Sequence, residues 1–171
     1  MPENIVARDL MLHDVAGIRR DQTLGEAMQA LVDLQADKEI PNALVVLDAD
    51  GNYEGILTAR LLCKSLLDTW TPREATARDD AGLEQDLLSL VRQRSDLPVH
   101  DALNPDLPTA EIGDRLLRLI QLSTDQRLEF IPVVDKGHVH GLVPVTRIFL
   151  ATASLALAPE DEGVRFDQGQ A

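Results

Sequence analysis

Few residues of this chain have types and spacings that could do chemistry. His138 and His140 stand two positions apart, so a strand would place both imidazoles on one face, where they could hold a metal ion. No cysteine or carboxylate cluster accompanies them in the sequence, and a solvated strand is the simpler interpretation. Thr58 stands where a helix is expected to begin, and the simplest role of its hydroxyl there is that of an N-cap.

Nothing in the chain resembles a catalytic arrangement. It has no glycine-rich phosphate loop, no Gly-x-Ser-x-Gly motif and no paired carboxylates framed by a histidine. We therefore expect no enzymatic activity. The single cysteine, Cys63, excludes an internal disulfide, and its place in an apolar run predicts a small buried hydrophobe.

The charge of the chain limits its partners. A formal net charge of −13 argues against nucleic acid and against an anionic membrane surface, both of which need clustered basic residues. It still allows a small anion held by backbone N–H groups and one or two arginines. No apolar run approaches the 18 residues of a membrane span, and no targeting segment is visible, so we expect a cytoplasmic protein.

An internal repeat organises the sequence. Three pairs of identical residues stand 92 positions apart: Asp9 and Asp101, Asp14 and Asp106, and Leu24 and Leu116. Further along, Gly55 recurs as Gly141 at an offset of 86. The shorter offset indicates insertions in the first copy, mostly at 37–42. Each copy has roughly 60 residues, about the least that buries a core alone, so two copies should pack together.

Each copy reads as a short strand, a helix, two strands and a helix. In the first copy we expect these at 15–18, 24–34, 44–47, 53–57 and 58–68, with a Thr23–Glu26 capping box before the first helix. In the second copy they fall at 107–110, 112–122, 128–134, 138–143 and 145–157. A crossover helix followed by a tight hairpin predicts a small mixed sheet with helices on one face, an α/β (α+β) fold.

The remaining segments connect or follow the copies. We divide the chain into a first repeat at 1–68, a linker at 69–95, a second repeat at 96–157 and a tail at 158–171. The linker contains an amphipathic helix whose apolar stripe should pack on the repeats or on a partner; the stripe consists of Leu83, Leu87, Leu90 and Val91. The tail is acidic and polar, and we expect it to be disordered.

The ordered set of matches, present twice, resembles a pair of cystathionine-β-synthase (CBS) domains, also called a Bateman module. The second copy is nearest to the family in its central strand, Phe130-Ile131-Pro132-Val133-Val134-Asp135. Gly55-Ile56-Leu57-Thr58 and Gly141-Leu142-Val143 resemble the strand before the second helix. Ala7–Met11 and Val99–Leu103 resemble the lead-in helix of each repeat. The resemblance covers nearly all of residues 5–157.

The resemblance implies a fold and a class of function. Two such domains pack through their sheets about a pseudo-twofold axis, and their clefts commonly hold AMP, ADP, ATP or S-adenosylmethionine. These modules are sensors without chemistry of their own, they regulate another protein, and they usually form flat homodimers. In the family motif, Gly is followed by two apolar residues, Thr or Ser, two further residues and Asp. The Thr or Ser opens a helix that faces the phosphate, and the Asp accepts hydrogen bonds from the ribose.

This chain departs from the motif in both repeats. The first repeat keeps Thr58 but has Leu61 at the Asp position, while the second has Pro144 for Thr and Arg147 for Asp. Loss of a charge-assisted hydrogen bond is worth roughly 1.5–3 kcal/mol, so any nucleotide should bind weakly, on the order of 10 µM or worse.

The two expected clefts are unequal. The better one would join two sets of residues: Ile56, Thr58 and Arg60 of the first repeat with Thr109, Ala110, Phe130 and Ile131 of the second. The poorer one would join Leu142, Pro144 and Arg147 to Gly17, Ile18, Leu44 and Val45. A weak adenine-nucleotide sensor with one residual site is one hypothesis. The alternative is a ligand-free interaction module in which Thr58 only caps its helix.

The second helix of each repeat also predicts self-association. Its apolar residues extend beyond one face, which indicates burial on more than one side. In the first repeat they are Leu61, Leu62, Leu66 and Leu67, and in the second the set is Ile148, Phe149, Ala151, Thr152 and Leu155. We therefore expect a homodimer that modulates an unidentified protein.

Overall fold

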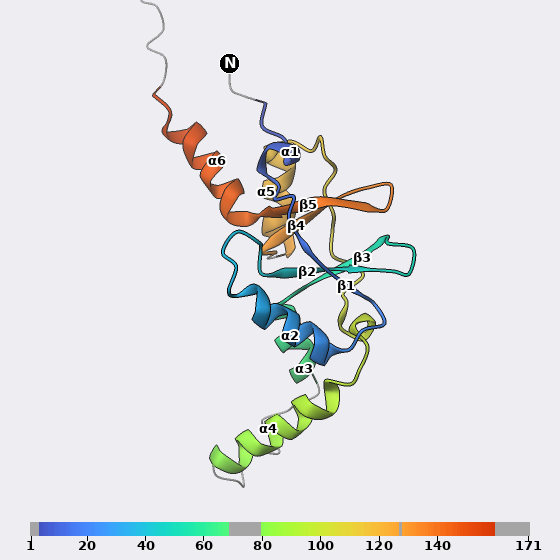
Figure 1. Cartoon of the computed structure of the whole chain (residues 1–171). Helices are drawn as coiled ribbons and strands as arrows, with labels where there is room; N and C mark the ends of the chain where they lie inside the picture. The colour runs from blue at the N-terminus through green and yellow to red at the C-terminus, as the bar shows by residue number, and fades with distance from the viewer. Residues whose placement is uncertain (1–3, 69–79, 127, 160–171) are drawn as a thin grey trace, which may run out of the picture.

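The computed structural model describes residues 4–68, 80–126 and 128–159. Two small β-sheets lie against each other, and each sheet is covered on its outer side by helices (Figure 1). The first sheet has the strand order β1-β2-β3 and the second consists of β4 and β5. The fold is therefore the mixed α/β repeat arrangement that the sequence predicts.

The first repeat contains five elements in the expected order. They are β1 (Ala16–Arg19), α2 (Leu24–Leu34), β2 (Ala43–Leu47), β3 (Tyr53–Thr58) and α3 (Ala59–Leu67). Strand β1 is parallel to β2, and β2 is antiparallel to β3. The predicted capping box forms at the start of α2, because the Glu26 amide donates to Thr23 Oγ1 at 3.1 Å and the Thr23 amide donates to Glu26 Oε2 at 2.8 Å.

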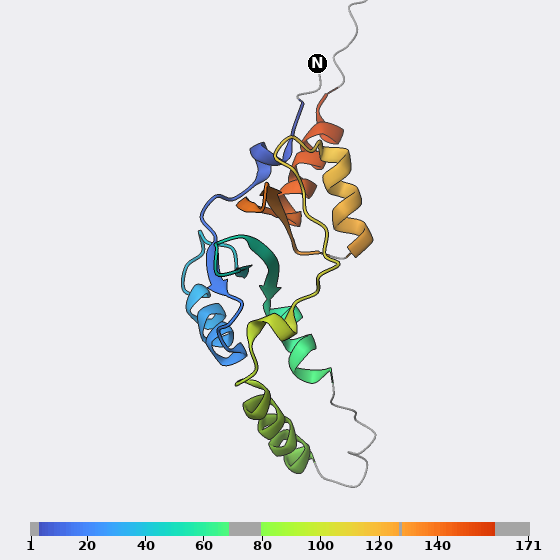
Figure 2. The same cartoon turned by 90° about the vertical axis from the view of Figure 1, so that its right-hand side faces the viewer.

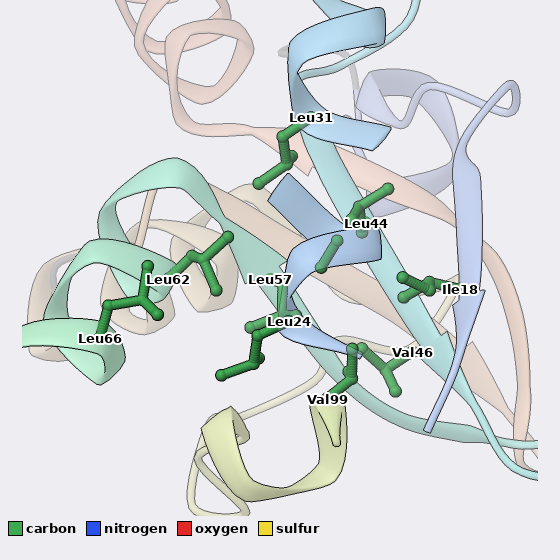
Figure 3. Packing of buried hydrophobic residues seen from close by; sticks show 10 residues of the cluster. Ile18, Leu24, Leu31, Leu44, Val46, Leu57, Leu62, Leu66 and Val99 are labelled. Carbon is green, nitrogen blue, oxygen red and sulfur yellow. The ribbon is translucent and has the colours of Figure 1, made fainter. Parts of the chain in front are cut away.

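Strand β2 is buried on both faces, which explains its unbroken apolar sequence. Leu44 and Val46 point toward the helices and join the core of the first repeat (Figure 3). Ala43 and Val45 point to the opposite face and join a separate cluster between the repeats. The alternation of a strand thus divides one short run between two apolar cores.

The second repeat has a two-stranded sheet and two helices. Its elements are α5 (Leu116–Gln126), β4 (Phe130–Asp135), β5 (His138–Pro144) and α6 (Val145–Leu157). Strands β4 and β5 are joined by a tight turn in which Lys136 and Gly137 have φ angles of 50° and 81°. Two consecutive left-handed residues match the twist of a hairpin, and glycine adopts that conformation without strain.

The lead-in segments exchange partners between the repeats. Helix α1 (Ala7–Leu10) belongs to the first repeat in sequence but packs on the second, where the Ala7 amide donates to the Asp114 carbonyl at 2.8 Å. The 3₁₀ helix η2 (Val99–Ala102) packs on the first repeat, where the Val99 amide donates to the Gln22 carbonyl at 2.7 Å. This reciprocal exchange ties the repeats together (Figure 2).

The linker helix α4 (Asp80–Arg94) extends away from the body of the molecule (Figures 1 and 2). It contacts α3, and Val91 packs against the core of the first repeat. The other residues of the predicted stripe are only half-buried, and α4 has no fully buried residue. The first part of the linker, 69–79, and the tail beyond residue 159 lie outside the described residues.

Two sequence predictions about the second repeat are wrong. The strand expected at 107–110 is a single parallel bridge between Ala110 and Val133, because Pro108 has no N–H to extend the ladder. The helix expected from residue 112 begins at Leu116. The N-terminal segment pairs with the intervening backbone, since the Arg8 amide donates to the Ile112 carbonyl at 3.2 Å.

The burial predicted for Cys63 is also wrong. Cys63 is exposed, whereas its neighbour Leu62 is 3% exposed and lies in the core. The apolar run around Cys63 contains more residues than the buried face of α3 can hold. Cys63 is therefore left facing solvent.

Candidate functional site

An apolar cluster fills the space between the two repeats. Its buried members are Ala43, Val45 and Ile56 from the first repeat and Leu142 from the second. Partly buried side chains pack against it from both sides, including Leu61, Leu107 and Phe130. The contact between the repeats is therefore mostly aliphatic, as the low aromatic content of the chain predicts.

Thr58 lies at the edge of this cluster and caps α3. Its side chain is buried, at 6% exposure, and its Oγ1 accepts a hydrogen bond from the Leu61 amide at 3.3 Å. This bond satisfies one of the N–H groups that a helix start leaves open. The hydroxyl therefore already has a structural partner at the position where a ligand phosphate would need it.

Leu61 makes the cleft beside Thr58 apolar. It packs against the same apolar cluster as Phe130 and Leu107, although it stands on α3 of the first repeat. An apolar side chain there cannot accept hydrogen bonds from a ligand, and it occupies space in the contact between the repeats.

The structure brings together only part of the predicted ligand set. Ile56 and Phe130 meet in the cluster between the repeats. Ala110 and Ile131 belong instead to the core of the second repeat, below its helices. The backbone of Ala110 is engaged as well, because its amide donates to the Pro132 carbonyl at 2.8 Å and its carbonyl accepts from the Val134 amide at 2.9 Å.

The two remaining predicted residues, Arg60 and Thr109, are exposed. Arg60 precedes Leu61 on the first turn of α3, and Thr109 precedes the bridge at Ala110. Neither side chain belongs to the apolar cluster. Any polar ligand would therefore meet these residues at the rim of the contact between the repeats.

An open pocket lies on the other side of Leu61. It has a volume of about 310 Å³ and is lined by α3 and by the segment that follows η2. Leu61, Lys64 and Ser65 lie on α3, Asp68 is its C-cap, and the segment is 101–105. Apart from Leu61, no residue at the ligand positions of the family motif lines this pocket. The repeat offset of 92 makes 101–105 the counterpart of 9–13 in the first repeat. This correspondence was the sequence signal that could have pointed to the segment.

A second pocket of about 420 Å³ adjoins the same segment, and it is lined by Glu54, His100, Leu103 and Pro105. Arg20 donates to Glu54 Oε1 and, at 3.1 Å, to Nδ1 of His100. Because guanidinium only donates, Nδ1 of His100 is the acceptor in this arrangement. The second oxygen of Glu54 is buried without a hydrogen-bond partner among the described residues. Sequence reasoning missed this group, since its members lie 34 and 80 positions apart.

Burial changes the ionisation of one side chain at the contact between the repeats. Tyr53 packs against the apolar cluster, and desolvation raises its pKa to about 12. Its hydroxyl has no hydrogen-bond partner among the described residues. In the neighbouring turn, the Asn52 amide donates to Asp48 at 2.8 Å and lowers the pKa of that carboxyl.

The histidine pair considered for a metal is on the surface. His138 and His140 are both exposed on β5, and His140 Nε2 lies 4.0 Å from Asp135 Oδ2. Within residues 4–68, 80–126 and 128–159, no three His, Cys, Asp or Glu side chains gather as metal ligands would. No helix in these ranges is both long enough and apolar enough to cross a bilayer.

Comparison with known proteins identifies the repeat. Residues 7–68 match the CBS domain family. The first repeat is therefore a CBS domain. A search of curated proteins finds no match to the chain.

Solved structures share the fold across both repeats. The CBS-domain containing protein ATU1752 from Agrobacterium tumefaciens is 23% identical, with a TM-score of 0.62 over 86% of this chain and 92% of that one. CBSX2 in complex with AMP is 16% identical, with a TM-score of 0.60 over 88% and 98%. The cytosolic domain of the Mg²⁺ channel MgtE in complex with ATP is 21% identical, with a TM-score of 0.60 over 86% and 48%. The chain therefore has the fold of a CBS-domain pair.

The second repeat departs further from the family motif than the first. Pro144 caps α6 with an extended backbone, a φ of −67°, and without a side-chain hydrogen bond. Arg147 is exposed and donates to the Leu10 carbonyl at 3.4 Å, so it holds the exchanged α1 segment. On the facing repeat, Ile18 and Leu44 lie in the first core rather than between the repeats. This cleft offers no side-chain acceptor for a ribose at the two motif positions.

Proposed function

We propose that this CBS pair is a non-catalytic, dimeric regulatory module that acts through contacts with other protein surfaces. In this proposal its Thr58 cleft does not take adenine nucleotides. The observation that carries the proposal is the position of Leu61, which packs with Phe130 and Leu107 against the apolar cluster between the repeats. A ribose placed there would lose its hydrogen bonds to water without gaining a carboxylate acceptor.

Calorimetric titration with AMP, ADP, ATP and S-adenosylmethionine tests the closed cleft. We expect no saturable binding of any of the four up to about 1 mM ligand. Saturable binding that is lost in Thr58→Val but retained in Thr58→Ser would show that the cleft is open and would overturn this part of the proposal.

The second candidate is a weak adenine-nucleotide sensor with one site per chain. The pocket of about 310 Å³ beside Leu61 favours it, because Lys64 supplies a cation there. The AMP complex of CBSX2 shows that a protein of this fold accepts such a ligand. Under this candidate the affinity is on the order of 10 µM or weaker, and Leu61→Asp tightens it by restoring a ribose acceptor. If Leu61→Asp leaves nucleotide binding absent, this candidate is wrong.

Dimerisation is the part of the proposal that can be measured without a ligand. Light scattering at micromolar concentration should give about twice the chain mass of 18.8 kDa. The regulated protein is a separate cytoplasmic partner in this proposal, and it would be sought by its binding to the dimer.

A further inference from the structure

The exchanged lead-in segments of the two repeats make matching contacts, with one exception. The contacts found in both repeats, at positions related by the repeat offsets, are the bridges Val6–Arg115 and Pro98–Thr23, and the packing of Met11 beside Gly141 and of Leu103 beside Gly55. The exception is the next residue along. Leu12 exchanges two backbone hydrogen bonds with Leu142 of β5, whereas the corresponding residues Asn104 and Ile56 form no bridge.

The backbone of Ile56 faces the outer edge of β3. Ile56 lies opposite Val45 as Leu142 lies opposite Pro132, so the two hairpins have the same register. Leu142 directs its N–H and C=O away from β4, to Leu12, and Ile56 must direct its own away from β2 in the same way. In the part of the chain that the structure describes, these two groups have no backbone partner. Ile56 is 2% exposed, and backbone groups so buried are normally hydrogen-bonded.

A tight turn engages the residue that would otherwise pair with this edge. The Asn104 carbonyl accepts from the Leu107 amide at 3.4 Å, a long bond, and the Asn104 side chain accepts from the Asp106 amide at 3.0 Å. Pro105 favours this turn, and its counterpart in the first repeat is His13. The carbonyl of Asn104 is therefore used within the turn and not by Ile56.

The segment that contains the turn has open space on both sides. Leu103 and Pro105 line both the pocket of about 310 Å³ and the pocket of about 420 Å³. The contact of Leu103 with Gly55 is made by flexible side-chain atoms. The segment carries the chain from η2 on the first repeat toward the second repeat (Figure 2). Its position against β3 therefore depends on the turn more than on packing.

We propose that residues 103–107 are a strap with two positions. In the observed position the turn at Asn104 is closed. In the second position the turn opens, and Asn104 exchanges two backbone hydrogen bonds with Ile56, as Leu12 does with Leu142. The change replaces two hydrogen bonds of the turn by two at the strand edge, so the two positions have similar free energies.

The strap connects the two pockets with the contact between the repeats. Leu107 packs against the apolar cluster between the repeats, and its amide is held by Asn104 only while the turn is closed. Because Leu103 and Pro105 line the pockets, an occupant of either pocket that favours one strap position also changes the support of Leu107. This inference goes beyond the proposed function and depends on neither dimerisation nor nucleotide binding.

Hydrogen exchange of two equivalent amides, followed by NMR on the full chain, tests the strap. We expect the Ile56 amide to be about tenfold less protected than the Leu142 amide in the parent chain. The double variant Asn104→Leu, Pro105→His gives the strap the residues of the first lead-in segment, and it should raise the protection of Ile56 about tenfold. If the double variant leaves Ile56 unchanged, or if the parent already protects Ile56 as well as Leu142, the inference is wrong.

The reciprocal exchange is the matched control. Leu12→Asn with His13→Pro introduces the Asn-Pro-Asp sequence of the strap into the first segment, and it should lower the protection of Leu142 about tenfold without affecting Ile56. Circular dichroism should show both double variants folded. A loss of protection at both amides would mean that the turn sequence acts through general destabilisation, which contradicts a local strap.

A third variant tests the connection to the contact between the repeats. Leu107→Ala removes packing that supports the closed turn, so it should raise the protection of Ile56 relative to Leu142 about threefold. The ratio of the two amides corrects for any global loss of stability. An unchanged ratio would show that the strap is not coupled to the apolar cluster, and that part of the inference would be overturned.

Discussion

The two repeats complete their sheets in different ways. In the first repeat, β1 runs parallel to β2 over four residues. In the second repeat, the corresponding segment is reduced to the bridge between Ala110 and Val133, and a residue from outside the repeat serves the other edge. Leu12 exchanges two backbone hydrogen bonds with Leu142 of β5, at 2.8 and 3.1 Å. The repeat fold thus accepts different segments at these edges of its sheets, provided that the backbone N–H and C=O groups that face them are hydrogen-bonded.

The outer surfaces of the repeats differ more than their cores. Thr58 caps α3 with its hydroxyl, while Pro144 precedes α6 without a side-chain bond. Helix α3 exposes the charged side chains of Arg60 and Lys64, whereas α6 exposes the apolar side chains of Phe149, Leu150 and Leu157. Both cores remain aliphatic. The divergence is therefore concentrated at the ligand positions and the outer helices.

The largest effect should come from a matched pair of glycine substitutions. A Cβ on Gly141 would overlap the Leu12 carbonyl oxygen, which is backbone, and would come within 3.2 Å of its carbonyl carbon. A Cβ on Gly55 would meet the flexible Leu103 side chain at 2.9 Å. We expect Gly141→Ala to lower the free energy of unfolding by roughly 3 kcal/mol and Gly55→Ala by about 1 kcal/mol, measured by urea denaturation. If both substitutions lower the free energy of unfolding equally, the backbone at Leu12 yields to the added methyl group as easily as the Leu103 side chain does.

Most elements of this fold follow from local sequence signals. The capping box at Thr23, the glycine of the β4–β5 turn and the long apolar helix α6 each depend on neighbouring residues, and each forms as predicted. The late start of α5 could not be read locally, because it depends on the N-terminal segment, which pairs with residues more than 100 positions away. The short segment at Ala110 has a local cause, since Pro108 has no N–H to extend the ladder.

The candidate site was predictable in its motif positions and not in its packing. The motif places Thr58 at a helix start, and the structure bears this out. Alternation along β4 would have placed Phe130 and Ile131 on opposite faces, and the structure does so. The pocket beside Glu54 joins β3 to η2 and to the segment that follows η2, so no local spacing in the sequence predicts it.

A second pair of variants tests whether Leu61 is structural. Leu61→Asp places a carboxylate against the apolar cluster, which should lower the free energy of unfolding by about 2 kcal/mol. Cys63→Asp is the control on the same helix, where the side chain is exposed and the cost should stay within about 0.5 kcal/mol. Chemical denaturation measures both. If the two substitutions cost the same, Leu61 is not part of the contact between the repeats.

Tyr53 provides a pH test of the same contact. Its pKa rises to about 12 in the folded chain, against an ordinary value near 10. Folding therefore favours the neutral phenol, so stability is unaffected below pH 10 and falls as the pH rises toward 12, by roughly 2 kcal/mol in all. Because the chain has one tyrosine, absorbance near 295 nm follows this group alone. Tyr53→Phe should remove this part of the pH dependence, and a phenol that titrates near pH 10 in the folded chain would contradict the burial.

The smallest effect separates the two roles of Thr58. Thr58→Val keeps the shape of the side chain and removes the oxygen that accepts from the Leu61 amide, so it should cost about 1 kcal/mol of stability. Thr58→Ser keeps the acceptor and should cost less than half as much. The second repeat begins α6 at Pro144 without any such bond, so a hydroxyl is not required by the fold plan itself. If Thr58→Val leaves the urea midpoint unchanged, capping does not account for this threonine, and a ligand contact at the Thr58 cleft becomes the better explanation.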